Sequence, residues 1–196
     1  MPTTTLRTLS GLDEKPAALG DSTVILIDYQ NTYTRGVMEL EGWREALDAA
    51  ADLLARARAA GAPVIHVMND GGEGTPYDVR AEIGQIHPSV APAEGERVVV
   101  KQVPDAFAGT DLAELVDAAG HQDVVVAGFM THMCVTFTTA SAFLRGNRPT
   151  VVAAASATRP LPSAGTELTA EQVHRSALAT ITDLYGVVVE SPADLG

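Results

Sequence analysis

The sequence contains a single cysteine, so no disulfide can form within the chain. A lone cysteine is either a small buried hydrophobe or a reactive thiol. Long apolar runs are absent as well. No stretch approaches the length of a membrane span, and the first residues do not join a basic segment to an apolar one as a secretory signal does. We therefore expect a cytoplasmic protein that does not insert into a membrane.

Basic residues are scarce. The 196 residues include 13 Lys and Arg against 25 Asp and Glu, which gives a formal net charge of −12. Such a chain repels nucleic acid phosphates and anionic membrane surfaces, so we expect neither as a partner. The acidic residues are spread along the chain, which is typical of a surface that keeps a protein in solution.

The composition is that of an ordinary globular protein. Apolar residues make up 46% of the chain and charged residues 19%, without a repeat or a biased tract. A chain of this length is typical of one domain. We expect an N-terminal arm over residues 1–20, followed by a single domain over residues 21–196.

Short, branched apolar runs recur along the chain, as expected for strands buried on both faces of a parallel sheet. They cover residues 22–28, 63–68, 97–101, 123–129, 150–154 and 187–189. Amphipathic segments between them predict helices over residues 43–60, 111–119, 134–145 and 168–185. This alternation predicts an α/β fold whose parallel strands are joined by right-handed crossovers.

Capping residues support two of the helix boundaries in particular. Gly61 follows the first predicted helix, where a glycine can adopt the left-handed conformation that ends a helix. Thr169 and Gln172 have the spacing of a capping box at the start of the last one.

Three residues of complementary chemistry lie at strand ends. Asp28 ends the first strand, Lys101 ends the third, and Cys134 follows the fourth by five residues. In open parallel sheets, ligands bind outside the carboxyl ends of the strands. A cysteine nucleophile needs a nearby base or cation, and the start of a helix favours a thiolate. The pattern therefore predicts a catalytic site with a cysteine nucleophile.

Each of the three also has an ordinary structural interpretation. An Asp at a strand end often caps a turn, a Lys there is often solvated, and a Cys before a helix is often a packing residue. Their coincidence at one edge of one predicted sheet favours function.

The motifs around these residues resemble those of the isochorismatase-like cysteine hydrolases, a family that includes nicotinamidases and other amidases. They are ILIDYQNTY at the first strand, VVVKQVPDAFAGTDL around the lysine and VVVAGFMTHMCV before the cysteine helix. The resemblance covers most of the chain. It implies a Rossmann-like three-layer α/β/α sandwich with a six-stranded parallel sheet, and a catalytic triad of Asp28, Lys101 and Cys134.

The same resemblance implies the mechanism. Asp28 acts as general base and acid, Cys134 forms a thioester with the substrate, and Lys101 is the electrostatic partner. A non-proline cis peptide is expected between Met130 and Thr131, and the backbone N–H groups of Met130 and Cys134 are expected to form the oxyanion hole.

One feature of the nicotinamidases is missing. They carry an Asp-x-His metal motif after the second strand, whereas this chain has HVMNDGGEGTPYD. We therefore expect no metal and no other cofactor, and we expect His66 to be a hydrogen-bonded core residue. The runs NDGGEGT, GFMTHMCV and SATRPLPS are most similar to a metal-free subgroup that includes streptothricin hydrolase, which suggests a small-molecule amide or lactam as substrate.

The substrate pocket is expected to use side chains from the loops around the triad. These are Tyr33, Trp43, Phe107, Phe129 and His132. Core packing is the alternative for Trp43 and Phe129, and an outward-facing position is the alternative for His132, which we also consider as a second proton carrier.

Other functions stay open at this point. They are a vinyl ether hydrolase of the isochorismatase type, a nicotinamidase, and a non-catalytic small-molecule-binding or redox-sensing protein on the same fold. The resemblance also implies a homo-oligomer, either a dimer or a tetramer.

Overall fold

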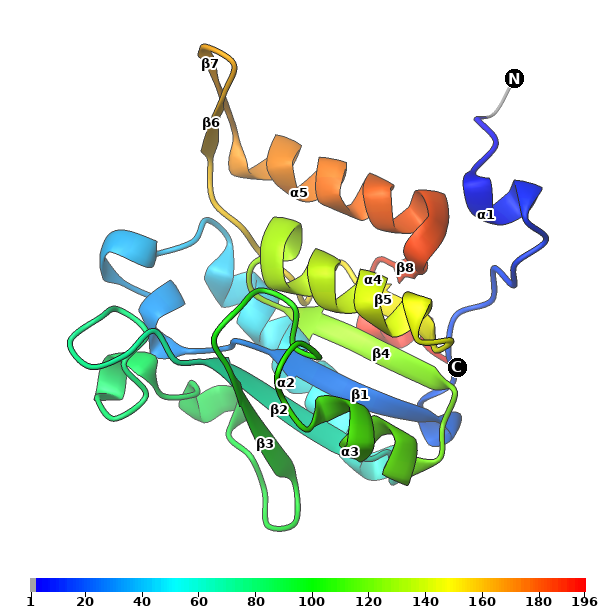
Figure 1. Ribbon diagram of the computed structural model, residues 1–196, viewed down its shortest axis with the longest axis horizontal. Helices are drawn as coiled ribbons and strands as arrows, with labels where there is room; N and C mark the ends of the chain where they lie inside the picture. The colour runs from blue at the N-terminus through cyan, green and yellow to red at the C-terminus, as the bar shows by residue number, and fades with distance from the viewer. Residues whose placement is uncertain (1–2) are drawn as a thin grey trace.

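A computed structural model describes residues 3–196 of the chain. Its centre is a six-stranded parallel sheet with the strand order β3-β2-β1-β4-β5-β8 (Figure 1). The strands are β1 (Ser22–Ile27), β2 (Val64–Asn69), β3 (Arg97–Lys101), β4 (Asp123–Gly128), β5 (Arg148–Val152) and β8 (Val187–Val189). All six predicted strands are present, and the predicted α/β fold class is confirmed.

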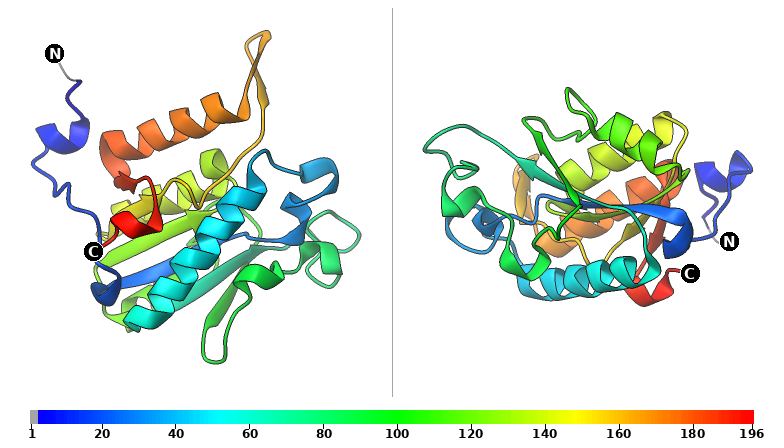
Figure 2. Two further views of the ribbon diagram at one scale, coloured as in Figure 1. Left: turned by 180° about the vertical axis from the view of Figure 1, so that it is seen from behind. Right: turned by 90° about the horizontal axis from the view of Figure 1, so that it is seen from below.

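Helices cover both faces of the sheet (Figure 2). The helices are α2 (Trp43–Ala60), α3 (Leu112–Ala119), α4 (Thr136–Leu144) and α5 (Ala170–Thr180). Helix α2 packs on one face, whereas α3, α4 and the end of α5 pack on the other. The structure is therefore the three-layer sandwich that the resemblance implied.

The core follows from the alternation of side chains along each strand. In β1, Val24 and Leu26 face α2, while Ile25 and Ile27 face α3 and α4. All four are at most 1% exposed. Because both faces of β1 are covered, its sequence is continuously apolar and needs no polar alternation.

The last predicted helix, over residues 168–185, starts later than expected. Thr166–Leu168 forms strand β7, which pairs with β6 (Leu161–Ser163) in a hairpin. The capping box of Thr169 and Gln172 is confirmed, and α5 begins at the residue after Thr169. The hairpin escaped prediction because its strands have only three residues each and carry no apolar alternation.

The N-terminal arm is not wholly extended. Residues 1 and 2 lie outside the described part, and Leu6–Leu9 forms the short helix α1. The Leu6 N–H donates to Asp183 Oδ1 at 3.0 Å, and Arg7 Nη1 donates to the Leu184 carbonyl at 3.0 Å. These contacts fasten the arm to the turn Ile181–Tyr185 that follows α5.

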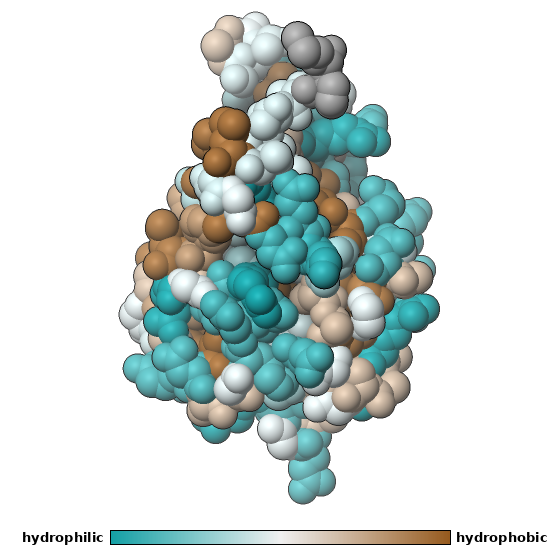
Figure 3. Space-filling view, turned by 90° about the vertical axis from the view of Figure 1, so that its right-hand side faces the viewer, coloured by the Kyte–Doolittle hydropathy of each residue, from teal (hydrophilic) through white to brown (hydrophobic). Residues whose placement is uncertain are grey.

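The surface near the two chain ends is mostly polar. Figure 3 shows this side of the molecule, where hydrophilic side chains cover much of the surface. Among residues 3–196, no helix is both long enough and apolar enough to cross a membrane.

His66 is buried and hydrogen-bonded, as predicted. Its Nε2 lies 2.8 Å from Glu96 Oε2, and Glu96 also accepts hydrogen bonds from Arg58 at 2.7 and 2.9 Å. The Arg58 hydrogen bond is the main reason that the pKa of Glu96 falls to about 2. The His66 contact therefore belongs to a structural network that ties β2 to α2.

We expect Glu96→Gln to lower the free energy of unfolding by about 1 to 2 kcal/mol at pH 7, since a charged acceptor is lost from a mostly buried network. The pKa of Glu96 is lower in the folded state, at about 2, than its ordinary value of 4.5. Its stabilisation is therefore complete above pH 4.5 and declines as the pH falls toward 2. Urea unfolding at neutral and acidic pH measures both effects.

Glu171→Gln is the control, because Glu171 forms an exposed pair with Arg175 and is expected to change stability by less than about 0.5 kcal/mol. An equal loss for Glu96→Gln at pH 7 and at about pH 3 would contradict the electrostatic account.

Candidate active site

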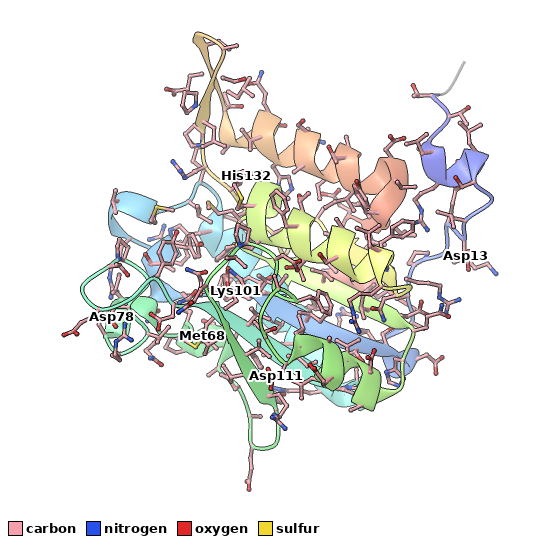
Figure 4. The ribbon with its side chains drawn as sticks, viewed as in Figure 1. Asp13, Met68, Asp78, Lys101, Asp111 and His132 are labelled. Carbon is pink, nitrogen blue, oxygen red and sulfur yellow. The ribbon has the colours of Figure 1, made fainter. Side chains whose placement is uncertain are left out.

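Asp28, Lys101 and Cys134 meet at the carboxyl edge of the sheet. Lys101 Nζ lies 2.7 Å from Asp28 Oδ2 and 3.3 Å from Cys134 Sγ. The residues are 0%, 1% and 6% exposed, respectively. Figure 4 shows Lys101 in the interior of the molecule, between the strands and α4. The structure thus brings together the three residues that the sequence singled out.

The backbone at Asp28 turns the chain out of the sheet. Its φ of +54° lies in the left-handed region, which Asp tolerates better than most residues. The Asp28 N–H still donates to the Val67 carbonyl at 2.8 Å, so the residue is held against β2 while the chain leaves the sheet. A non-glycine residue in this conformation costs about 1 kcal/mol or more, and such residues cluster at functional sites.

Burial determines the protonation of the thiol. It raises the pKa of Cys134 to about 12, with a further increase from the Asp28 charge, against the opposing effect of Lys101. Burial also raises the pKa of Asp28, although Lys101 opposes this. For Lys101, burial lowers the pKa, but Asp28 and Cys134 outweigh it and leave the pKa above its ordinary value.

The resting site therefore holds a protonated thiol beside a Lys101 ammonium. The sequence favoured a thiolate from the helix start and the nearby cation, but the desolvation of Cys134 is the larger effect. Asp28 Oδ1 is buried and accepts no hydrogen bond from residues 3–196, so an acceptor for the thiol proton is available.

The turn before the cysteine differs from the prediction by one residue. The non-proline cis peptide joins Phe129 to Met130, not Met130 to Thr131. The reason is that Thr131 already begins the helical turn Thr131–Val135, with its N–H donating to the Ala157 carbonyl at 3.0 Å. The change from strand to helix therefore occurs one peptide earlier.

Gly128 makes this turn possible. Its φ is +155°, and a Cβ at this position would lie 2.2 Å from the Ile27 carbonyl oxygen. Any side chain here would push β4 away from β1, and with it the turn that carries Cys134.

The proposed oxyanion hole has one donor without a competing partner. Within residues 3–196, no acceptor is recorded for the Met130 N–H, whereas the Met130 carbonyl accepts from Val135 at 3.3 Å. The assignment of the Met130 and Cys134 N–H groups to an oxyanion stays a prediction.

Tyr33 lies beside the triad. Its ring centroid is 5.6 Å from that of Phe129 and 5.8 Å from that of Tyr77. Burial raises the pKa of Tyr33 well above its ordinary value, and the charges of Asp28 and Cys134 raise it further, which places them close by. Phe129 is 0% exposed, so it packs in the core, with its ring in a T-shaped contact with that of Tyr33.

Two predicted pocket residues lie elsewhere. Phe107 follows a turn tied to the middle of α4, because Asp105 accepts from Ser141 at 2.6 Å. Its ring therefore faces the guanidinium of Arg145, 5.1 Å away, at the far end of α4 from the cysteine. Trp43 starts α2, and its ring lies 4.2 Å from the guanidinium of its neighbour Arg44, with no recorded contact to the triad among the described residues.

His132 lies next to the site, but its side chain already has a hydrogen-bond partner. Its Nδ1 is 2.5 Å from Thr158 Oγ1, and burial, together with the charge of Arg159, lowers its pKa. It lines a cavity of about 320 Å³ with residues of the β6–β7 hairpin and α5. In Figure 4 it lies at the start of α4, toward α5. The Thr158 contact makes His132 a poor second proton carrier.

Sequence reasoning missed four residues of the site. They are Gln30, Asn69, Tyr77 and Arg159. Asn69 had a usable signal, since it ends β2 at the same edge as Asp28 and Lys101, but the predicted strand stopped one residue short. Arg159 stands in the segment beside Ala157, which pairs with Phe129 in an isolated bridge.

A separate cavity of about 410 Å³ lies between α2 and α5, apart from the triad. It is lined by Glu45, Glu171 and His174 among others, and by none of the triad. Within residues 3–196, no group of three or more His, Cys, Asp or Glu side chains is arranged to hold a metal ion.

The three-layer α/β/α sandwich and the buried cluster of Asp28, Lys101 and Cys134 are those that the motifs led us to expect. The Isochorismatase domain model matches residues 22–192. The chain therefore belongs to the isochorismatase family, as the motifs indicated.

Relatives and a solved structure agree with this membership. The secreted isochorismatase effector Isc1 of Verticillium dahliae is 32% identical over 94% of this chain and 96% of its own length. Streptothricin hydrolase of Streptomyces noursei is 36% identical over 72% of this chain and 56% of its own, and maleamate amidohydrolase of Pseudomonas putida is 34% identical over 72% of each. The crystal structure of an isochorismatase from Pseudomonas putida KT2440 has a TM-score of 0.95 and 39% identity over 100% of both chains. The chain is thus an enzyme of a family whose named relatives include amidohydrolases.

Proposed function

We propose that this enzyme hydrolyses the C–N bond of a small amide or lactam through a thioester on Cys134, without a metal or other cofactor. One observation carries the proposal. The buried Lys101 ammonium contacts both the Asp28 carboxylate and the Cys134 sulfur. A binding protein has no need for a base, a cation and a thiol in one buried cluster.

The first half-reaction forms the thioester. Asp28 takes the thiol proton as Sγ attacks the substrate carbonyl carbon, and the C=O electron pair moves to the oxygen. The N–H groups of Met130 and Cys134 stabilise that oxyanion. When the oxyanion collapses, the C–N bond breaks and Asp28 returns its proton to the departing nitrogen.

The second half-reaction releases the acid. Asp28 removes a proton from a water molecule, whose oxygen attacks the thioester carbon. The C–S bond then breaks, and the sulfur recovers the proton from Asp28. Lys101 stabilises the sulfur whenever it carries negative charge, which offsets the high pKa that burial gives the thiol.

Arg159 supports a narrower substrate class, an amide that also carries an anionic group such as a carboxylate. Its Nε is buried without a hydrogen-bond partner among the described residues, and no ion pair is recorded for it there. Its charge lowers the pKa of both His132 and Tyr77, so the guanidinium lies near both. An unpaired guanidinium near Tyr77, whose ring packs against that of Tyr33, is suited to a carboxylate.

A substrate panel tests this proposal. It contains an amide with a free carboxylate, the matching neutral amide, a lactam, nicotinamide and isochorismate, each assayed with and without a chelator. We expect amide hydrolysis that is indifferent to the chelator. We also expect Arg159→Met to raise KM for the carboxylate substrate by about 10- to 100-fold, through the loss of a charged hydrogen bond, and to leave the neutral amide unaffected.

Arg97→Met is the matched control, because Arg97 is an exposed cation at the amino end of β3, away from the triad. Turnover of isochorismate alone would replace amide hydrolysis by vinyl ether hydrolysis. Chelator-sensitive turnover of nicotinamide would overturn the metal-free proposal, and equal losses on both amides would refute the role of Arg159.

The remaining expectations are also proposals. We propose a small-molecule substrate, a homo-oligomer of two or four chains, no nucleic acid or membrane partner, and a cytoplasmic location. One relative, the Isc1 effector of Verticillium dahliae, is by contrast a secreted protein.

A further inference from the structure

The Lys101 ammonium has three polar contacts inside the protein, an ion pair with Asp28 and hydrogen bonds to Cys134 and Asn69. Nζ lies 2.7 Å from Asp28 Oδ2, 3.3 Å from Cys134 Sγ and 3.3 Å from Asn69 Oδ1. An ammonium has three donors and no acceptor, so its one ion pair and two hydrogen bonds match the number of its N–H groups. Because Lys101 is 1% exposed, bulk solvent is poorly placed to replace a lost partner. The third contact, to Asn69, plays no part in the bond-making steps.

Asn69 lies where β2 loses its neighbour on one side. Strand β1 ends at Ile27, and the left-handed Asp28 directs the chain away after its N–H has bonded to Val67. The backbone N–H and C=O of Asn69 on this side therefore have no strand to pair with. Buried backbone groups without partners are costly, so a substitute is needed.

The side chain of Gln30 is that substitute. Its Oε1 accepts the Asn69 N–H at 2.9 Å, and its Nε2 donates to the Asn69 carbonyl at 2.9 Å and to the Gly84 carbonyl at 2.6 Å. Gln30 is 0% exposed. Its carboxamide thus takes the place of a peptide group of β1 and fixes the backbone of Asn69 through both its N–H and its C=O.

We infer that Asn69 is a positioning residue for the catalytic lysine. Its side-chain carbonyl takes the third hydrogen of the Lys101 ammonium so that the other two face Asp28 and Cys134, and Gln30 holds Asn69 in place. This inference rests on the proposed function, because it assigns the residue a role through Lys101. It adds two residues that act on the site without touching the reacting atoms.

The consequence is electrostatic as well as geometric. Without Asn69, one donor of the ammonium is free and the group can turn away from Sγ and Oδ2. The pKa of Cys134 and that of Asp28 then rise, because Lys101 lowers both in the intact site. A base and a nucleophile with higher pKa values work only at higher pH.

Asn69→Leu, which removes the acceptor at similar volume, is the main test. We expect kcat to fall about 10- to 100-fold, as it does when outer partners of catalytic groups are lost, with KM little changed. We expect the acid limb of the pH profile of kcat/KM to move to higher pH, and alkylation of Cys134 by iodoacetamide at a fixed, mildly alkaline pH to slow. Asn69→Asp, which keeps an acceptor oxygen, is expected to recover part of kcat while its added charge keeps the acid limb high.

The decisive measurement compares Lys101→Met with the double variant that also carries Asn69→Leu. If Asn69 acts through Lys101, adding Asn69→Leu to Lys101→Met changes the alkylation rate by less than about twofold. Gln30→Met is expected to shift the pH profile in the same direction as Asn69→Leu. Asn31→Leu is the control, since buried Asn31 donates to the Glu82 carbonyl at 2.7 Å without contacting Asn69 or Lys101.

The outcomes separate this inference from the proposed function. Alkylation needs no substrate, so it tests Asn69 even if the enzyme hydrolyses no amide in the panel. An Asn69→Leu protein that folds and has the wild-type pH limb and alkylation rate overturns the inference. A full, additional loss in the Lys101→Met background, or the same pH shift from Asn31→Leu, also overturns it. If Asn69→Leu fails to fold, the uncharged Gln30→Met variant is judged by the same pH limb and alkylation rate, and wild-type values for it overturn the inference.

Discussion

Replacement of Cys134 by alanine is expected to lower kcat/KM for the amide substrate by at least about 10⁴-fold, as the loss of a covalent nucleophile does in other hydrolases. Cys134 Sγ lies 3.3 Å from Lys101 Nζ, and the chain has no second cysteine to replace it. Steady-state kinetics, with detection limits set by the uncatalysed rate, measure the loss.

A covalent intermediate provides an independent check on the same residue. Mass spectrometry of wild-type enzyme quenched in acid during turnover is expected to show one acyl group on Cys134, and none on Cys134→Ala. The circular dichroism spectrum of the variant is expected to be unchanged, because alanine is smaller than the cysteine it replaces. Retention of amide hydrolysis by Cys134→Ala, or by enzyme fully alkylated at Cys134, would exclude the thioester mechanism.

The second large effect is expected for Asp28→Asn, which removes the proton acceptor while keeping the shape of the side chain. We expect a loss of about 10² to 10⁴ in kcat, the usual contribution of a general base. The wild-type rate is expected to fall in acid at a higher pH than for an ordinary carboxylate, because burial raises the pKa of Asp28 and only the ionised form accepts the proton. The pH profile of kcat/KM measures this limb.

Asp28→Asn also leaves Lys101 without its counter-ion in a buried position. We expect a loss of about 3 to 5 kcal/mol in the free energy of unfolding, as when one partner of a buried pair is removed. The double variant Asp28→Asn and Lys101→Met carries no unpaired charge, so it is expected to recover stability but not activity. If the double variant regains both, the loss in the single variant reflects misfolding and not the missing base.

Hydrogen bonds between distant segments explain why half of the site escaped sequence reasoning. Gln30 and Asn69 are polar residues in loops or at a strand end, where many roles are open. Only the fold shows that the Gln30 carboxamide replaces a strand partner of Asn69 and that Asn69 then meets Lys101. Nothing in the local sequence around either residue encodes a contact across 39 positions.

The direction in which a side chain points could not be predicted from the local sequence either. Phe107 was expected in the pocket because it follows the lysine strand closely in sequence. The link from Asp105 to Ser141 turns that loop toward the middle of α4, so the ring packs near Arg145 instead. Conversely, Tyr77 lies in a long loop that is far from Tyr33 in the sequence. Its ring nevertheless packs against that of Tyr33 beside the triad.

The sequence by itself determined the succession along the chain of the six strands of the parallel sheet and of helices α2 to α5, because apolar periodicity, glycine C-caps and the Thr169 capping box are local properties. It also placed Asp28, Lys101 and Cys134 at one edge, because the strands they end or follow run parallel. The tertiary structure alone decided the protonation of the site. Desolvation depends on what every neighbouring segment covers, and this burial raises the pKa of Cys134, an effect that the charge of Lys101 opposes.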